Sequence, residues 1–321
     1  MATLVFLEHH DGELQKGSLG VLAKAAALGD SEVAGVVAGS GVGELASKAG
    51  TFGATKVWVA DDPALEAPLP QPRVDVLEQV IREGGYDTVL FAASVLATDV
   101  AAGLAARLDA GLNWDLVDLE RRDGTLVGTR PALGDSVYVE VGWKSEPRLA
   151  LVRSGTFEPV ATEGEADVAE VAVDLQEHST RATMLEQAHE EQVGPSIEDA
   201  DIVVAGGRGL GGPENFALVE ELAKALGGAV AATRAVVDAG WYPYSTQVGQ
   251  TGKSVSPKLY VACGISGAIQ HKVGMQSSNV IVAINKDANA PIFEFCDLGV
   301  VGDLHQVVPK LAELVRARKA G

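Results

Sequence analysis

Residues 201–226 read DIVVAGGRGLGGPENFALVEELAKAL, an apolar run, a loop rich in glycine and an amphipathic segment in direct succession. The run from Asp201 to Ala205 has the length and apolar character of a buried strand, and Pro213 opens the segment that ends at Leu226, as proline often does at the start of a helix. A strand that passes through a tight turn into a helix is the repeating unit of a parallel α/β sheet. The stretch therefore predicts an α/β domain with its ligand site beyond the carboxyl ends of the strands.

The same alternation continues to the C-terminus. Further elements are predicted as strands at 229–232, 259–262 and 280–284, helices at 266–273 and 304–318, and a short apolar segment at 292–296. Short strands alternating with helices are typical of a doubly wound sheet.

The N-terminal half shows a second series of this kind. Strands are predicted at 3–7, 33–38, 56–60 and 88–93, and helices at 16–28, 44–49, 74–83 and 98–108. After Asn113 short runs at 115–121, 126–129, 137–141 and 150–152 are separated by turn residues, which predicts hairpins and a mixed sheet. Residues 156–196 have no sustained apolar period and are predicted to be a linker zone.

The predicted fold class is α/β, with two α/β domains that each contain a largely parallel sheet. The domains span residues 1–190 and 191–321, and the second is expected to be Rossmann- or flavodoxin-like. The length of 321 residues agrees with this division, because domains average roughly 150 residues.

Charge and composition exclude several classes of protein. The net charge is −19, and residues 1–190 hold 31 of the 44 acidic and 14 of the 25 basic residues, so this half carries −17. Such acidity argues against nucleic acid or an anionic membrane as a partner. No apolar run approaches the roughly 18 residues of a membrane span, so no membrane insertion is expected. Two cysteines, Cys263 and Cys296, fit a reducing compartment, which indicates a cytoplasmic protein or a mature matrix form.

Three glycine-containing loops resemble known motifs. Gly207, Gly209 and Gly212 match G-x-G-x-x-G, which leaves an NAD(P)-dependent dehydrogenase open, although the acidic residue expected about 20 positions later is absent. A tight turn before a helix explains the same pattern. The stretch GQTGKS lacks the first glycine of a phosphate-binding loop, and GISGA lacks the last glycine of a nucleophile elbow.

The loops of the second domain carry polar residues with few credible acid–base pairs. Hydroxyls, amides and a few cations suit a large, partly anionic ligand such as a dinucleotide. Free N–H groups at the start of the helix predicted at 266–273 could receive a pyrophosphate. Asp303 could accept from a ribose hydroxyl or simply cap the last helix, and His271 is either a ligand or a satisfied core histidine.

The segments ATRAVVDAGW, QVGQTGKSVSPKLYVACGISGAIQH and VAINKDANAPIFEFCDLGVVGDL, together with GGRGLGGPENF, resemble the α subunit of the electron transfer flavoproteins. The resemblance covers nearly all of residues 201–315 in order. It implies one FAD held mainly by the C-terminal domain, near the boundary with a β subunit. The positions that match cofactor-binding residues of the family are Arg208, Thr233, Arg234, Gln247, Val248, Gly249, Gln250, Thr251, Ser266, Gly267, Ala268, Ile269, Gln270, His271, Asn285, Lys286, Asp303 and Leu304.

The family also implies a role for several of these positions. Thr251 matches the residue whose hydroxyl bonds flavin N5, Arg234 the residue whose guanidinium lies against the isoalloxazine, and His271 a donor to O2. Residues 247–250 match the lining of the ring and ribityl chain. The remaining positions are assigned by the resemblance to the diphosphate and adenosine, namely Ser266, Gly267, Gln270, Asn285 and Lys286, with Asp303 beside the adenine ribose. Arg208 lies in the family's Gly-Arg-Gly loop, and Thr233 replaces a common serine.

The implied function is electron transport, not enzymatic turnover. The resemblance implies a heterodimer that accepts electrons from flavoprotein dehydrogenases, such as the acyl-CoA dehydrogenases of fatty acid β-oxidation, and delivers them singly to a quinone oxidoreductase. An anionic semiquinone would be stabilised by donors or positive potential from His271 and Arg234. The N-terminal domain would contact the β subunit, to which the family's AMP belongs. A bifurcating relative with a second FAD on the β subunit remains an alternative.

Overall fold

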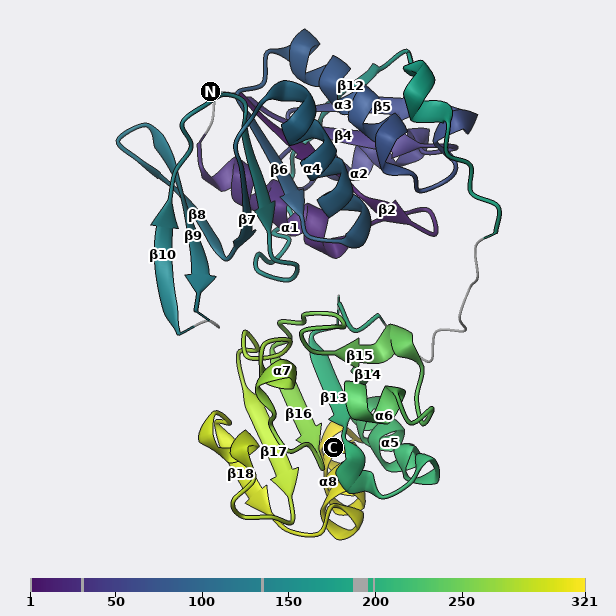
Figure 1. The fold of residues 1–321 in the computed structure, drawn as a ribbon, viewed down its shortest axis with the longest axis vertical. Helices are drawn as coiled ribbons and strands as arrows, with labels where there is room; N and C mark the ends of the chain where they lie inside the picture. Colours follow the sequence, from purple (N-terminus) through teal and green to yellow (C-terminus); the bar gives the residue numbers. More distant parts are fainter. Residues whose placement is uncertain (1, 30–31, 134–135, 187–195, 199, 321) are drawn as a thin grey trace. The chain divides into compact units, whose positions relative to one another are not determined.

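The computed structural model describes residues 2–29, 32–133, 136–186, 196–198 and 200–320. The chain divides into two compact units, Met1–Gln187 and Ala188–Gly321 (Figure 1). The boundary predicted at 190/191 falls within residues 187–195, which lie outside the described residues. Both units are α/β with a parallel sheet, as predicted from the strand–helix alternation.

The first unit is built on a seven-stranded sheet in the order β12-β5-β4-β1-β6-β11-β7, in which every neighbouring pair is parallel. The strands are β1 (Ala2–Phe6), β4 (Glu32–Gly39), β5 (Lys56–Asp61), β6 (Thr88–Ala92), β7 (Leu112–Leu116), β11 (Arg148–Val152) and β12 (Asp167–Glu170). A small hairpin joins β2 (His9–His10) to β3 (Glu13–Leu14). The central strands β1, β6 and β11 of the seven-stranded sheet are nearly continuous apolar runs because both faces of the sheet are covered.

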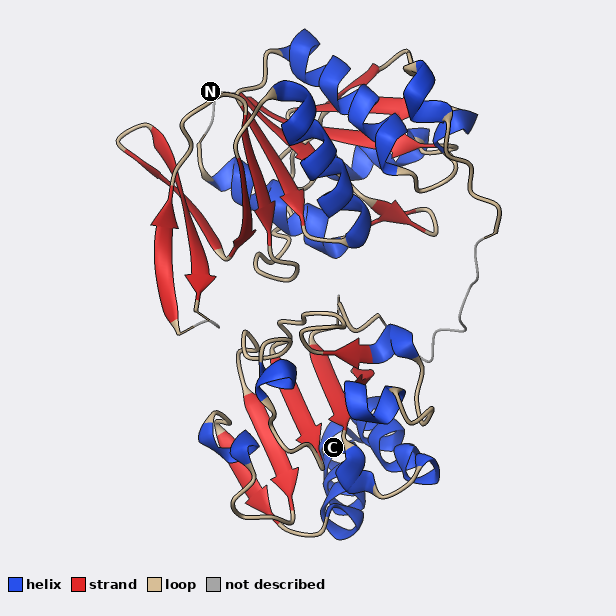
Figure 2. Ribbon diagram, viewed as in Figure 1, coloured by secondary structure: helices blue, strands red, loops and turns tan. Residues whose placement is uncertain are grey.

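Helices cover both faces of this sheet (Figure 2). On one face pack α3 (Pro70–Gly84) and α4 (Val95–Leu108), whose apolar residues share a core with Leu4 and Phe91. On the other face pack α1 (Lys16–Ala27) and α2 (Ala46–Gly50) against Val5 and Leu90. Alternate residues of one strand therefore belong to two different cores.

The prediction of a mixed sheet after Asn113 was wrong. The hairpin strands β8 (Asp118–Arg122), β9 (Thr125–Ala132) and β10 (Val137–Val141) form a separate antiparallel sheet, while β7 and β11 join the parallel one. The linker zone predicted at 156–196 was also too long, since it contains the edge strand β12. The reason is burial: β11 is apolar on both faces, whereas β10 is exposed along most of its length.

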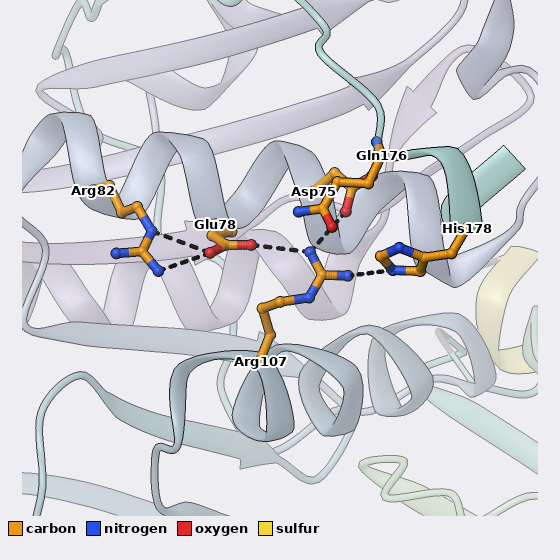
Figure 3. A network of polar contacts seen from close by, with 6 residues as sticks. All are labelled: Asp75, Glu78, Arg82, Arg107, Gln176 and His178. Carbon is orange, nitrogen blue, oxygen red and sulfur yellow. Dashed lines mark hydrogen bonds and ion pairs between the residues drawn. The ribbon is translucent and has the colours of Figure 1, made fainter.

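A polar network fixes the segment that follows β12 (Figure 3). Arg107 of α4 donates to Asp75 Oδ1 at 2.8 Å and to Glu78 Oε2 at 2.9 Å, both on α3. Its guanidinium also lies 3.0 Å from His178 Nε2, and Asp75 Oδ2 accepts the backbone N–H of Gln176 at 2.9 Å. The network joins two helices to the 3₁₀ turn Glu177–Thr180 at the end of the first unit.

The second unit contains a six-stranded parallel sheet in the order β15-β14-β13-β16-β17-β18. Its strands are β13 (Ile202–Gly206), β14 (Ala229–Thr233), β15 (Gln247–Val248), β16 (Leu259–Cys263), β17 (Ile281–Asn285) and β18 (Leu298–Val301). One face is covered by α5 (Phe216–Leu226) and α8 (Leu304–Ala320). The opposite core is closed mainly by loop residues such as Val255, Met275 and Ile292.

Several elements of the second unit differ from expectation. The helix predicted at 266–273 is a single turn, α7 (Ile269–Lys272), and the segment at 292–296 contains a 3₁₀ turn, Pro291–Glu294. The short elements β15, β18 and α6 (Arg234–Val237) were not predicted, because two to four residues carry too little periodicity. Within the described residues no helix is long and apolar enough to cross a bilayer.

Candidate functional site

The second sheet has a topological switch point beside β13. From β13 the chain moves to β14 and β15 on one side, and then returns to β16, β17 and β18 on the other. The loops that follow β13 and β16 lie together: the N–H of Gly207 donates to Cys263 O and that of Gly209 to Gly264 O, each at 2.9 Å. Ligands of open α/β sheets bind in the crevice at this place.

The close approach of these two loops depends on glycine. Gly264 has φ +64°, and a Cβ on it would lie 2.9 Å from the backbone of Gly209. The two hydrogen bonds also use N–H groups that a nicotinamide-binding G-x-G-x-x-G loop would direct at its pyrophosphate. The pattern at Gly207, Gly209 and Gly212 is therefore accounted for by the packing of one loop on another.

The residues singled out in the sequence all lie at this carboxyl edge of the sheet. They follow or end five strands and occupy the short strand β15 and its turn: Arg208 after β13, Thr233 and Arg234 at β14, Gln247–Thr251 at β15, Ser266–His271 after β16, Asn285 and Lys286 at β17, and Asp303 and Leu304 after β18. The structure thus brings residues spread over 97 positions to one edge.

The loop after β16 offers a row of backbone donors. Among the described residues, the N–H groups of Ser266–Gln270 have no acceptor. The helix expected to begin at Ser266 begins only at Ile269, because Gly267 has φ +88° and Ile292 donates its N–H to Ser266 O at 3.0 Å. The donors therefore belong to a loop and not to a helix terminus. Successive free N–H groups of this kind suit a phosphate anion.

The turn after β15 presents a hydroxyl to solvent. Gln247 is 2% exposed, and its Nε2 donates to Oγ1 of the exposed Thr251 at 3.2 Å. Because the amide fills one lone pair of that hydroxyl, the hydroxyl proton is available to an external acceptor. Tyr244 donates its hydroxyl to the backbone carbonyl of Thr251 at 3.0 Å, which fixes the turn from outside. The geometry fits donation to a ring nitrogen.

His271 is a buried, internally bonded residue. Its Nδ1 lies 3.0 Å from Val248 O and its Nε2 lies 3.0 Å from the hydroxyl of Tyr260. Burial lowers the pKa of His271 to about 4, against the smaller opposing effect of the bond to Val248. Burial therefore favours the neutral ring at pH 7. The expectation that His271 supplies a donor or positive potential to a flavin stays a prediction.

The cations of the edge are exposed. Among the described residues, Arg234 pairs with Asp238 alone, at 3.2 Å between Nε and Oδ2, and its side chain is 65% exposed. Arg208 and Lys286 are exposed and have no ion pair with any described residue. All three guanidinium or ammonium groups are free to turn toward an anionic ligand.

Asn285 and Asp303 form hydrogen bonds with backbone groups at this edge. Asn285 donates from Nδ2 to Ile265 O at 2.9 Å and accepts the N–H of Asp287 at 3.0 Å, so both ends of its amide are engaged. Asp303 caps α8 by accepting the N–H of His305 at 3.0 Å. Its other carboxylate oxygen has no partner among the described residues, so a cap and a ribose acceptor are compatible.

Sequence reasoning missed Tyr260, which holds His271. The available signal was a hydroxyl in the otherwise apolar strand LYVAC, since a buried tyrosine hydroxyl nearly always has a partner.

Comparison with known proteins agrees with this geometry. The family "Electron transfer flavoprotein domain" matches residues 3–176, and "Electron transfer flavoprotein FAD-binding domain" matches residues 196–276. A protein from Mycobacterium leprae named electron transfer flavoprotein subunit alpha is 43% identical over 319 residues, with 98% of both chains covered. A protein of the same name from Thermoanaerobacterium thermosaccharolyticum is 39% identical, again over 98% of both. Protein FixB from Clostridium saccharobutylicum is 41% identical over 96% of this chain and 94% of that protein.

The fold and the polar groups at the carboxyl edge of the second sheet define a two-unit α/β protein of the class that binds a dinucleotide cofactor. The chain belongs to the electron transfer flavoprotein alpha subunit family, whose members carry electrons and are not enzymes that convert a metabolite. The family resemblance is confirmed, and FAD is the cofactor of the second unit. The donors described above fit that cofactor: N–H groups for its diphosphate, a hydroxyl for a ring acceptor and cations for its negative charge.

Proposed function

We propose that this chain is the FAD-binding subunit of a heterodimer that accepts electrons from flavoprotein dehydrogenases, such as acyl-CoA dehydrogenases, and passes them singly to a quinone oxidoreductase. One observation carries the proposal: a row of free backbone donors, an oriented hydroxyl and three exposed cations gather at the carboxyl edge of one sheet, at its switch point. Such a site binds and tunes a redox cofactor without a general base. The cytoplasmic location stays a prediction from the sequence.

The chain's own residues would hold the cofactor in parts. The N–H groups of Ser266–Gln270 would bind the diphosphate, and Thr251 would donate its hydroxyl proton to a ring nitrogen. FAD, when bound, supplies the capacity to accept and release one electron at a time. Arg234 would lie near the ring and favour added negative charge, which raises the reduction potential. With His271 neutral, Arg234 is the main source of positive charge in this role.

The first unit offers a surface for the β subunit. Strand β10 is an edge strand of the antiparallel sheet, and it exposes Val137, Tyr138 and Val139 to 42%, 66% and 39%. Leu133, in the turn before it, is 83% exposed. Exposed apolar edge strands are sites of pairing with another chain.

A pair of variants tests this surface. Tyr138→Lys with Val139→Lys should reduce co-purification of the β subunit with the tagged chain, since two charges would enter an apolar interface. Val168→Lys on β12, which is 54% exposed at the edge of the parallel sheet, is the matched control and should leave co-purification intact. Full recovery of the β subunit with the double variant contradicts docking at β10.

Flavin counting and partial reduction test the function as a whole. The heterodimer purified after co-expression should hold one FAD and show a one-electron reduced flavin spectrum midway through titration with reductant. Reduced acyl-CoA dehydrogenase should then reduce it. Two flavins per heterodimer would indicate the bifurcating type instead, and a colourless complex that binds NAD(P) would refute the proposal.

A further inference from the structure

Tyr260 is a buried polar residue outside the set of expected cofactor contacts. It lies on β16, between β13 and β17, with Val203 and Ile281 as its strand neighbours. Its side chain is 0% exposed, and the hydroxyl lies 3.0 Å from Nε2 of His271. The two rings are tilted by 57° with centroids 6.1 Å apart, so the contact is between polar atoms and not a stack.

The partners of His271 fix which nitrogen carries the proton. A carbonyl oxygen can only accept, so the 3.0 Å contact with Val248 O requires a proton on Nδ1. In a neutral imidazole Nε2 then has a lone pair, and it accepts the hydroxyl proton of Tyr260. Burial lowers the pKa of His271 to about 4, in agreement with a neutral ring. The result is a directed chain, Tyr260 to His271 to Val248, that joins β16, α7 and β15.

The last carbonyl of this chain lies directly before the turn that carries Thr251. Gly249, with φ +143°, donates its N–H to Lys253 O at 3.1 Å, and Gln250 donates to Gln270 O at 2.7 Å. A Cβ on Gly249 would lie 2.8 Å from Gln270 O, so the turn packs directly against the backbone of Gln270, the residue before His271. The position of the turn is therefore coupled to the orientation of His271 through Val248 and Gln270.

We propose that Tyr260 is a positioning residue. It donates to Nε2 of His271, keeps the ring against Val248 O, and thereby holds the turn 248–251 where the Thr251 hydroxyl meets FAD. The final step, contact with FAD, rests on the function proposed above. The hydrogen-bonded chain itself does not depend on it.

The variant Tyr260→Phe removes only the hydroxyl and tests the chain in the heterodimer labelled with ¹⁵N-histidine. The Nε2 resonance of His271 should shift, and amide exchange at residues 249–251 should accelerate about tenfold, as expected for the loss of one buried hydrogen bond. Tyr86→Phe is the control, because Tyr86 is also buried and its hydroxyl accepts from Trp58 at 2.8 Å and donates to Glu32 at 2.8 Å in the first unit. Unchanged His271 resonance and exchange in Tyr260→Phe, or equal changes in the control, would overturn the proposal.

The consequence for the cofactor is measured separately. Tyr260→Phe should weaken FAD binding about tenfold and shift the flavin potential, and neither effect should increase further when the substitution is added to His271→Leu. Additive effects in the double variant would mean that Tyr260 does not act through His271. If the heterodimer bound no FAD at all, the proposed function would fail, while the resonance and exchange data would still decide the hydrogen-bonded chain.

A second pair of variants serves if Tyr260→Phe does not fold. His271→Gln keeps one amide donor for Val248 O and one oxygen to accept from Tyr260, whereas His271→Leu keeps neither. Amide exchange at 249–251 should stay near the wild-type rate in the first and rise in the second. Equal rates in the two variants would overturn the proposal.

Discussion

At the scale of single residues, the charge and the buried hydrogen bonding at the carboxyl edge belong to different side chains. His271 is neutral and is used to hold Val248, while the exposed Arg234 carries the charge that can act on a flavin. The position of His271 at the carboxyl edge was predictable from the sequence, because the loop after a parallel strand lies there. Its bonding was not predictable, since the direction of the Tyr260 side chain on the preceding strand, β16, follows only from tertiary packing.

Arg234→Ala should lower the flavin midpoint potential without affecting the fold. A cation a few ångströms from the ring is expected to favour the added electron by about 1 kcal/mol, or about 40 mV for one electron. The free energy of unfolding should change by less than about 0.5 kcal/mol, because the pair with Asp238 is exposed. Potentiometry and urea denaturation measure the two effects. Arg234→Lys, which keeps the charge, is the control, and equal potentials in wild type and Arg234→Ala would refute the role.

His271→Gln should flatten the dependence of stability on pH. The folded-state pKa of His271, about 4, lies below the value of 6.5 for the unfolded chain. Below pH 6.5 the unfolded chain therefore binds a proton that the folded chain does not, and stability is lost as pH falls from 6.5 toward 4, by about 3 kcal/mol. Urea denaturation between pH 4 and 7 measures this loss. The exposed His305→Gln should keep the wild-type profile, and a wild-type profile as flat as that of His271→Gln would contradict the assignment.

At the scale of elements, long and buried helices and strands were the ones best predicted from the sequence. The strands and helices with periodic or continuous apolar residues were predicted within a few residues, as for α5 and β16. The edge strands β12 and β18 were missed because each has only four residues, DVAE and LGVV, which are too few to show a period. The start of α7 was misplaced because Gly267 adopts a left-handed φ that sequence alone does not report. What escaped prediction therefore depends on tertiary contacts.

Arg107→Met should destabilise the first unit by about 2–3 kcal/mol, because it leaves the buried carboxylate of Asp75, 2% exposed, without its cation. Arg82→Met is the control. Arg82 binds the same Glu78 from an exposed position, so its replacement should lower the free energy of unfolding by less than about 0.5 kcal/mol. Urea denaturation of the full chain decides between them, and equal costs would show that the network of Figure 3 adds no stability beyond a surface pair.

The same network should make the first unit sensitive to acid. Burial alone would raise the pKa of Asp75, but hydrogen bonds from Arg107 and Gln176 outweigh it and hold that pKa below the ordinary 3.8. Glu78 likewise has its pKa below 4.5 because bonds from Arg82 and Arg107 outweigh burial. The stabilisation is complete above pH 4.5 and is lost as pH falls through the lowered values. Arg107→Met should reduce this loss in an acid titration, and an unchanged acid transition would contradict the account.

At the scale of the whole molecule, the two units differ in charge and in task. The half that carries −17 presents an apolar edge strand, and the nearly neutral half holds the cofactor crevice. We infer that the acidic charge influences the orientation of partners. Neutralising acidic surface residues of the first unit should change the ionic-strength dependence of heterodimer assembly or electron transfer. Identical rates at all salt concentrations would indicate that the acidic surface contributes to solubility alone.

The central claim is that the carboxyl edge of the second sheet holds FAD through its own loop donors. A crystal structure of the co-purified heterodimer tests it most directly. The claim predicts the FAD diphosphate against the N–H groups of Ser266–Gln270 and the flavin ring beside Thr251 and Arg234. A flavin bound elsewhere, or a ligand without a flavin ring in this crevice, would contradict it.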